Sequence, residues 1–481
     1  MTPKGRVYAV RLDDVPLKAA PLLKQELLAA GGDSAHARGV ADHSVPSTSA
    51  VLLATWAQYR RLLPKLARQP FRLEAIGAEV ERALRAYLRH GVRTVRGAHR
   101  AVLLGDRPRV MGIVNVTPDS FSDGGRFLDP AAAIAHAEAL AAEGADLLDV
   151  GAESTRPGAT PVSPAAEWRR LEPVLRGLAG RVDLPLSVDT RHPEVAARAV
   201  EAGADLVNDV EGLRAPAMRR VVARSGAAAI LVHLRGTPAT MQADLAYADV
   251  RDEVFRWLAA RADAAESDGI APDRLLVDPG IGFGKSAAQS LELLAHAAEL
   301  RSLGYPVVVG ASRKSFLGAA LGPRDAAGRL EASLAAAVLA AIRGVELVRV
   351  HDVGPTVRAL AVVRAVRDAA GAPPAETGPP TPAGSRPPAG RPRGQGALVV
   401  AREAVVDGAG DHPGDLDDLR RPALRADQDG PTRPRAAAHR PPPARGRRAA
   451  RAPRPAPGRP RGRRPGRWPR RRRPRSPGPS R

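Results

Sequence analysis

From residue 110 onward, short apolar runs alternate with longer stretches in which apolar residues recur at helical spacing. The short runs predict buried strands, and the longer stretches predict amphipathic helices. The predicted strands cover residues 110–114, 147–150, 186–188, 206–207, 228–232, 275–277, 307–309 and 347–350. The predicted helices cover residues 131–143, 165–178, 194–202, 217–225, 248–267, 290–303, 331–343 and 357–369.

Eight strands that alternate with eight helices predict an α/β fold of the (β/α)8, or TIM, barrel type for residues 99–370. An open doubly wound sheet is the alternative. The barrel is favoured because eight consecutive units with no long interruption are difficult to place in an open sheet.

Residues 1–98 carry a mixed pattern and no recognisable chemical motif. Strands are predicted at 7–12 and 51–55, and helices at 21–30, 57–67 and 76–88. We therefore predict an N-terminal α/β accessory region and favour an accessory role over a binding role.

Residues 371–481 are rich in Pro, Gly, Ala and Arg, which predicts a disordered tail. This segment holds 26 Arg, no Lys and 9 acidic residues, so it contributes 26 − 9 = +17 to the net charge of +22. It could be a basic arm for nucleic acid, a passive tail, or the translation of GC-rich DNA in an unintended reading frame. Of these three interpretations of the tail, nucleic-acid binding is the least favoured.

The chain contains no cysteine, which excludes disulfides, thiolate metal sites and a cysteine nucleophile. The N-terminus lacks a signal-peptide pattern, and no apolar run approaches the roughly 20 residues that cross a bilayer. We predict a cytoplasmic protein with no membrane segment.

All eight predicted strands lead into polar residues, and in this type of barrel the active site lies at the C-terminal ends of the strands. Asp189, Asn208 and Asp278 can accept hydrogen bonds, which suits a flat heterocycle with an amino-pyrimidine edge. Arg349 and His351 suit a phosphate or pyrophosphate, as do Arg156 and Thr155. Asn115 could be an oxygen ligand of Mg2+ that is held mainly by substrate phosphates.

Several motifs occur in order along the predicted barrel. They cover residues 111–125 (MGIVNVTPDSFSDGG), 149–158 (DVGAESTRPG), 187–190 (SVDT), 278–285 (DPGIGFGK), 312–318 (SRKSFLG) and 349–353 (RVHDV). Together they resemble the signatures of dihydropteroate synthase, a family of pterin-binding barrels. The resemblance covers about residues 108–368.

The resemblance implies a transferase of folate biosynthesis. Such an enzyme condenses 7,8-dihydropterin-6-ylmethyl diphosphate with 4-aminobenzoate, depends on Mg2+ and is usually a homodimer. It implies the following roles: pterin binding by Asp189, Asn208, Asp278 and Lys314; Mg2+ binding by Asn115; pyrophosphate binding by Thr155, Arg156, Arg349 and His351; aminobenzoate binding by Phe121, Pro157, Phe283 and Ser315; and catalysis by Asp123, Lys314 and Arg349.

Some polar residues near these motifs have simpler explanations. Glu153 and Asp352 could be capping or supporting groups, Lys285 a solvated loop charge, and Arg313 a structural neighbour of Lys314. Two other functions stay open: a pterin-dependent methyltransferase that serves a corrinoid, and a nucleic-acid-binding protein that acts through its basic tail.

Overall fold

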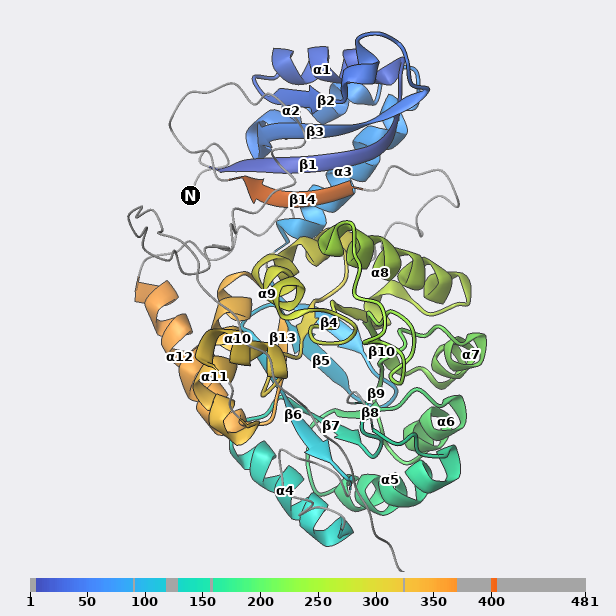
Figure 1. The fold of residues 1–481 in the computed structure, drawn as a ribbon, viewed down its shortest axis with the longest axis vertical. Helices are drawn as coiled ribbons and strands as arrows, with labels where there is room; N and C mark the ends of the chain where they lie inside the picture. Colours follow the sequence, from blue (N-terminus) through green and yellow to red (C-terminus); the bar gives the residue numbers. More distant parts are fainter. Residues whose placement is uncertain are drawn as a thin grey trace, which may run out of the picture. The chain divides into compact units, whose positions relative to one another are not determined.

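The computed structural model describes residues 6–89, 91–117, 129–155, 159–322, 325–369 and 399–404. Two structural parts are visible in Figure 1: a barrel and an N-terminal α/β part. The predicted barrel is confirmed. Its strands are β6 (Arg109–Asn115), β7 (Leu147–Gly151), β8 (Leu186–Asp189), β9 (Leu206–Asp209), β10 (Ala228–Val232), β11 (Leu275–Asp278), β12 (Val308–Val309) and β13 (Leu347–Val350).

Helices lie between consecutive strands and pack on the outside of the sheet (Figure 1). Several begin with proline directly after a capping residue, as in Asp129–Pro130 and Ser163–Pro164, because proline suits the first helical position. The main helices are α4 (Pro130–Ala142), α5 (Pro164–Leu178), α6 (Pro193–Glu201), α7 (Pro216–Ser225), α8 (Val250–Ser267), α9 (Ala287–His296), α11 (Leu330–Ile342) and α12 (Val353–Ala369). Short turns occur at η2 (Pro272–Arg274), η4 (Ser315–Leu317), α10 (Gly318–Leu321) and η5 (Ala327–Arg329).

One predicted helix has a different form. Residues 290–303 were expected to form a single α-helix, but α9 ends at His296 and the chain continues as the 3-10 helix η3 (Ala297–Leu303). Both helix types place buried residues at intervals of three to four, so the apolar pattern does not distinguish them.

The parallel strands follow one another in sequence order around the sheet. Val277 on β11 bridges to Val307 beside β12, which closes the barrel. Successive residues of a strand face opposite sides of the sheet. On β6, Val110 and Val114 pack against the helices, whereas Met111 belongs to the cluster inside the barrel. The polar residues that follow each apolar run therefore lie at one mouth of the barrel.

A hairpin that the sequence analysis missed covers the opposite mouth. Strands β4 (Arg93–Arg96) and β5 (Ala101–Leu104) place Val95, Val102 and Leu104 in the interior cluster of the barrel. Both strands are only four residues long, too short for a clear apolar pattern. The expected boundary at residue 98 falls inside this hairpin.

The N-terminal part is a sheet in the order β14-β1-β3-β2 with three helices. Buried leucines from the helices pack against the sheet around Tyr59, whose hydroxyl donates to the carbonyl groups of Tyr8 and Leu52. The expected α/β region is thus confirmed, with β2 added. Its elements are β1 (Val7–Pro16), α1 (Ala19–Ala29), β2 (Asp33–His36), η1 (Arg38–Val40), β3 (Ser47–Thr55), α2 (Trp56–Leu66) and α3 (Leu73–Tyr87).

Strand β14 (Val399–Ala404) comes from the segment that was predicted to be a disordered tail. It pairs antiparallel with β1, with Ala401 opposite Val10, and the two strands lie side by side in Figure 1. The prediction of disorder over all of 371–481 is therefore wrong for these six residues. Val10 and Ala401 are 401 − 10 = 391 positions apart, and pairing over that separation leaves no local signal in a stretch of Ala and Val. The remaining residues of that segment lie outside the described part of the chain.

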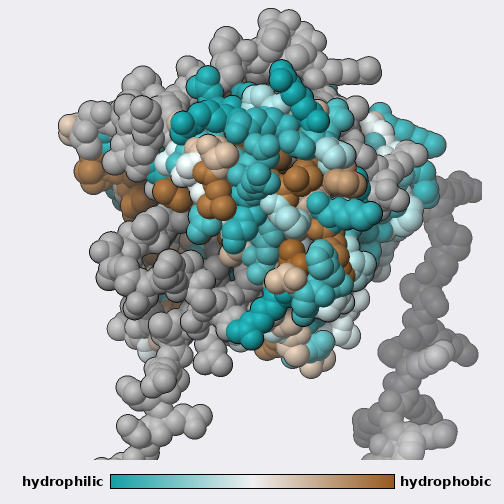
Figure 2. Space-filling view, turned by 90° about the horizontal axis from the view of Figure 1, so that it is seen from above, coloured by the Kyte–Doolittle hydropathy of each residue, from teal (hydrophilic) through white to brown (hydrophobic). Residues whose placement is uncertain are grey.

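The surface seen from above in Figure 2 is mostly hydrophilic, with hydrophobic residues in separate patches. Such a mosaic is normal for globular proteins. Among the described helices, none combines the length and the apolar content needed to cross a bilayer.

Candidate active site

Arg349, at the end of β13, is at the centre of the polar mouth of the barrel. Its Nη2 donates to Asp189 Oδ2 at 2.7 Å, and its Nε donates to Asp149 Oδ2 at 2.5 Å. Asn208 Nδ2 donates to the same oxygen of Asp149 at 3.0 Å. The structure therefore brings three predicted site residues, Asp189, Asn208 and Arg349, into one hydrogen-bonded cluster.

Asp149 is a member of this cluster that the sequence analysis did not predict. It lies on β7 with no exposed surface and joins Asn208 to Arg349. Its second carboxylate oxygen is buried and has no hydrogen-bond partner among the residues that the structure describes. A carboxylate inside the fully buried strand Leu147–Gly151 was the available signal, because a buried charge requires a partner.

Electrostatics in this cluster depend on burial and on Arg349. Burial raises the pKa of the Asp189 carboxyl, while the Arg349 guanidinium opposes that rise. Burial also raises the pKa of Asp278, and Lys314 opposes that rise. Asp278 ends β11, and its Oδ1 accepts the Gly280 N–H at 2.6 Å. Two acidic groups at the mouth are therefore each balanced by a neighbouring cation.

Lys314 lies between the predicted pterin and aminobenzoate residues. Its ammonium donates to the carbonyl of Ile281 and lies 4.2 Å from the centroid of the Phe283 ring. A Cβ at Gly282, where φ is +82°, would approach Lys314 Cδ to 3.1 Å. Glycine at this position thus lets the loop adopt its turn and leaves room for the lysine stem.

Lys285 is buried, so its interpretation as a solvated loop charge is wrong. Its ammonium donates to the carbonyls of Gly280 and Phe283 at 3.0 and 2.9 Å and lies 2.9 Å from His233 Nδ1. Burial lowers the pKa of His233 well below its ordinary value, so the neutral ring can accept a hydrogen bond at Nδ1. Lys285 therefore ties β10 to the loop that follows β11.

The last two strands end in a second small network. His351 lies 3.1 Å from Ser312 Oγ, and Arg313 Nη2 donates to Asp352 Oδ1 at 2.6 Å. Arg313 and Asp352 thus form a supporting ion pair between the loops after β12 and β13. Ser315 is exposed at the start of η4, Asn115 ends β6 half-buried, and Thr155 is half-buried in the loop after β7.

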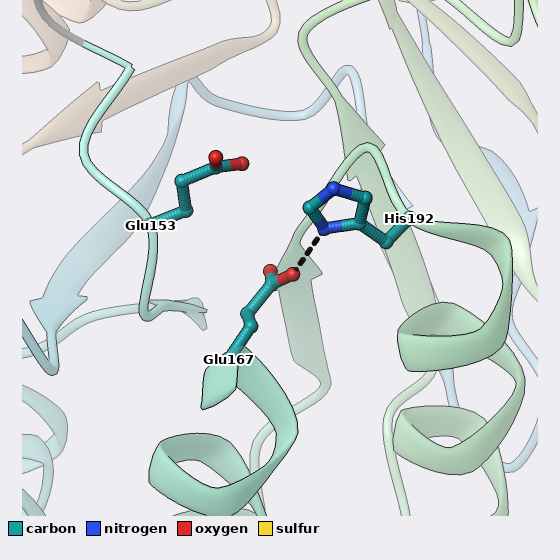
Figure 3. A group of neighbouring side chains, drawn as sticks. All are labelled: Glu153, Glu167 and His192. Atoms are coloured by element: carbon teal, nitrogen blue, oxygen red, sulfur yellow. Dashed lines mark hydrogen bonds and ion pairs between the residues drawn. The ribbon is translucent and has the colours of Figure 1, made fainter. Parts of the chain in front are cut away.

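Glu153, Glu167 and His192 form the group of described side chains whose geometry could accommodate a metal ion (Figure 3). Their ligand atoms lie within 4.8 Å of one another. However, Glu153 already receives two hydrogen bonds from Arg191, and His192 Nδ1 lies 2.6 Å from Glu167. We interpret these residues as a polar network that links the loops, and Asn115 is not among them.

Four predicted site residues, Phe121, Asp123, Arg156 and Pro157, lie outside the described residues. Their roles stay predictions.

Comparison with known proteins agrees with this geometry. The family of pterin binding enzymes matches residues 111–351. A dihydropteroate synthase of Neisseria meningitidis is 48% identical over 259 residues, which are 53% of this chain and 91% of that protein. A probable bifunctional folylpolyglutamate synthase/dihydropteroate synthase of Halobacterium salinarum is 44% identical over 372 residues, or 77% of this chain. The chain spans only 44% of that longer relative.

Solved structures give the same result. A Xanthomonas albilineans dihydropteroate synthase with 4-aminobenzoic acid is 51% identical, covers 57% of this chain and 99% of its own, and has a TM-score of 0.54. The dihydropteroate synthase from the same organism in complex with 7,8-dihydropteroate is 47% identical, covers 57% of this chain and 99% of its own, and has a TM-score of 0.52. With the polar mouth described above, these matches show that the chain belongs to the pterin-binding enzymes and, among them, to the dihydropteroate synthase family of transferases.

Proposed function

We propose that this chain condenses 7,8-dihydropterin-6-ylmethyl diphosphate with 4-aminobenzoate to give 7,8-dihydropteroate and pyrophosphate. The observation that supports this most is the cluster of Arg349, Asp149, Asp189 and Asn208 at the C-terminal mouth of the barrel. It offers alternating acceptors and donors to the edge of a flat heterocycle. Asp278 and Lys314 extend the same surface.

The reaction requires little proton abstraction, because an aromatic amine is already neutral near pH 7. Its difficult part is the departure of pyrophosphate from the pterin methylene. Arg349 and His351 would hold the leaving group, together with Thr155 and Arg156. The ring of Phe283 and the exposed Ser315 would border the aminobenzoate. Asp123 would face the positive charge that develops at the methylene.

Mg2+ fits the donor groups of this site. The amide oxygen of Asn115 at the end of β6 is a hard ligand, and a diphosphate would supply the other oxygens. When bound, Mg2+ would stabilise the negative charge of the leaving diphosphate. Asn115 would hold the ion, and the arginine side chains would fix the phosphate oxygens.

The direct test measures pyrophosphate release by the purified full-length chain with the pterin diphosphate and Mg2+, with and without 4-aminobenzoate. A chain that ends at residue 404 should be tested in parallel, because it keeps β14. Repeated turnover that requires the amine and stops when Mg2+ is chelated is expected from both. Tight pterin binding without turnover, together with methyl transfer to a corrinoid, would overturn the proposal.

The charge of Lys314 should set an upper pH limit for pterin binding. Burial lowers the pKa of Lys314 to about 8, although Asp278 opposes the shift. Protonated Lys314 can donate to the pterin, so affinity should be highest below about pH 8 and fall as pH rises through that value. At acid pH, protonation of Asp278 should weaken binding as well. Fluorescence titration of pterin binding from pH 5 to 10 checks this. In Lys314→Met the decline of affinity at alkaline pH should disappear, whereas the decline at acid pH should remain.

We also propose that the chain forms a homodimer through α11 and α12. These neighbouring helices expose Leu339, Ile342, Val362 and Val366, each more than half exposed. Four large apolar side chains on adjacent helices suit a symmetric interface.

Leu339→Glu should therefore convert a dimer into monomers, because a buried interface leaves the new carboxylate unpaired. Sedimentation velocity measures this directly. Leu103→Glu is the matched control, since Leu103 on β5 is also 50% exposed. A wild-type monomer, or an unchanged dimer in Leu339→Glu, would contradict the proposal.

A further inference from the structure

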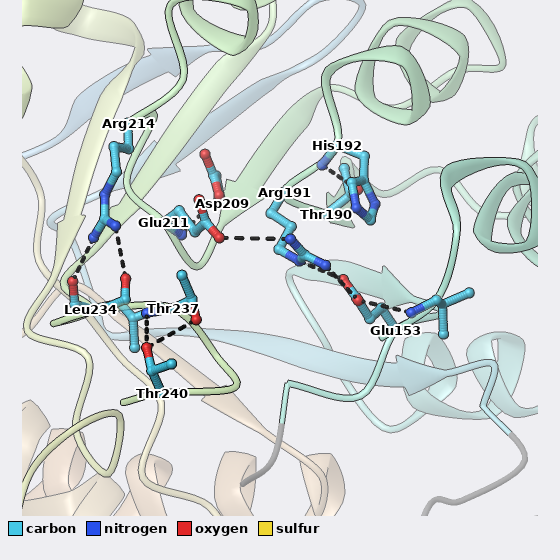
Figure 4. A network of polar contacts seen from close by, with 12 residues as sticks. Glu153, Thr190, Arg191, His192, Asp209, Glu211, Arg214, Leu234, Thr237 and Thr240 are labelled. Atoms are coloured by element: carbon cyan, nitrogen blue, oxygen red, sulfur yellow. Dashed lines mark hydrogen bonds and ion pairs between the residues drawn. The ribbon is translucent and has the colours of Figure 1, made fainter. Parts of the chain in front are cut away.

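Arg191 connects three successive loops at the mouth of the barrel (Figure 4). It lies two residues beyond Asp189, after β8. Its Nε and Nη2 donate to the two oxygens of Glu153, at 2.9 and 3.0 Å. Its Nη1 lies 3.8 Å from Glu211. Glu153 belongs to the loop after β7, and Glu211 follows β9, so one guanidinium spans the ends of three neighbouring strands.

Glu153 also forms a hydrogen bond within its own loop. Its Oε1 also accepts the backbone N–H of Val162 at 3.2 Å, which joins the two described ends of the loop between β7 and α5. Arg170 donates to the carbonyl of Ala152 at 3.0 Å and supports the same end. Thr155 lies two residues after Glu153. Arg191 therefore holds a carboxylate that bridges this loop two residues before Thr155.

The buried carboxylates in this region also require the positive charge of Arg191. The side chain of Glu153 is only 6% exposed, and the neighbouring Glu167 has no exposed surface. Burial raises the pKa of Glu167, and the negative charge of Glu153 adds to that rise. A forked guanidinium can neutralise Glu153 and satisfy both of its oxygens, which a single-point cation cannot do.

We infer that Arg191 is a positioning residue that couples the pterin-binding residues Asp189 and Asn208 to the diphosphate-binding loop that carries Thr155. This inference rests on the proposed function and adds to it. In this role Arg191 would act through Glu153 and not through a contact with either substrate. It sets the distance between the part of the site that binds the heterocycle and the part that binds the diphosphate.

The test compares two ligands by calorimetry on the full-length chain in the presence of Mg2+. One is the dihydropterin diphosphate, and the other is the same dihydropterin with a hydroxyl in place of the diphosphate. Arg191→Gln should weaken the diphosphate ligand about tenfold, the scale of effect that a small misplacement of a binding group produces, and change the hydroxyl ligand little. Millimolar guanidinium should partly restore the lost affinity in Arg191→Ala.

Three further variants keep the result interpretable. Arg191→Lys retains the charge without the fork and should show a smaller loss. Glu153→Gln should show a loss similar to that of Arg191→Gln, and the double variant should add little, because both act through one contact. Arg176→Gln removes an exposed arginine that pairs with Glu172 on α5 and should have no effect.

Unchanged affinity for the diphosphate ligand in Arg191→Gln, or an equal loss for both ligands, would overturn the inference. If Arg191→Gln does not fold, the same criteria apply to Arg191→Lys. Failure of the proposed function gives a different result, because the wild-type chain would then show no preference for the diphosphate ligand, and the inference would fall with it.

Discussion

Arg349→Met is expected to abolish turnover and to lower the free energy of unfolding by about 3–5 kcal/mol, the usual cost of removing one partner from a buried ion pair. Arg349 donates to both Asp149 and Asp189, and Asp149 has no exposed surface. Without the guanidinium, two carboxylates would face each other inside the barrel mouth. Urea denaturation and the pyrophosphate-release assay measure the two effects.

The pH dependence of this loss identifies its cause. Burial raises the pKa of the Asp189 carboxyl, and loss of the opposing Arg349 charge would raise it further above its value in the unfolded chain. Such a group disfavours the folded state increasingly as pH rises through that interval. The stability deficit of Arg349→Met should therefore be smaller at pH 5 than at pH 8.

The double variant Arg349→Met/Asp149→Asn is the control, because it also removes one of the unpaired charges. It should recover part of the stability but none of the turnover. A deficit that is independent of pH and unaffected by the second substitution would show that Arg349 acts through packing alone.

Lys285→Met is expected to have the second largest effect: a loss of about 3 kcal/mol in stability and a marked rise in the KM for 4-aminobenzoate. Methionine keeps the apolar stem but leaves the carbonyls of Gly280 and Phe283 without their donor, and each buried unsatisfied group costs about 1–3 kcal/mol. Phe283, which we propose to border the aminobenzoate, would then be poorly positioned.

Thermal denaturation and steady-state kinetics with each substrate varied in turn test this prediction. Lys24→Met is a suitable control, because Lys24 is exposed on α1. Equal stability of Lys285→Met and wild type, with an unchanged KM for the amine, would show that the loop holds its shape without the lysine.

Much of the fold follows from local sequence alone. The period of apolar residues between 110 and 369 identified eight strands and the helices between them, because a buried strand and an amphipathic helix each impose their own spacing. Strand ends were also predictable, since an apolar run that stops at Asn115 or Asp278 marks where the strand ends. That these ends form one site followed from the barrel topology.

The predicted site residues were identified by their types and by the family motifs, but their partners were not. Sequence order does not reveal that Arg349 reaches Asp149, 200 positions earlier. Lys285 was ambiguous for the same reason: a lysine in a loop is usually solvated, and only the packing of β10 against the loop that follows β11 buries it.

The sequence by itself therefore determined the (β/α)8 class, the order of its elements and the polar character of one mouth, because these depend on local periodicity. Only the tertiary structure decided that Asp149 joins the site, that Arg191 connects three loops, and that β14 completes the N-terminal sheet. Each of these depends on contacts between distant segments. The energies of these contacts come from buried charges and paired backbone groups, which produce no repeating pattern in the sequence.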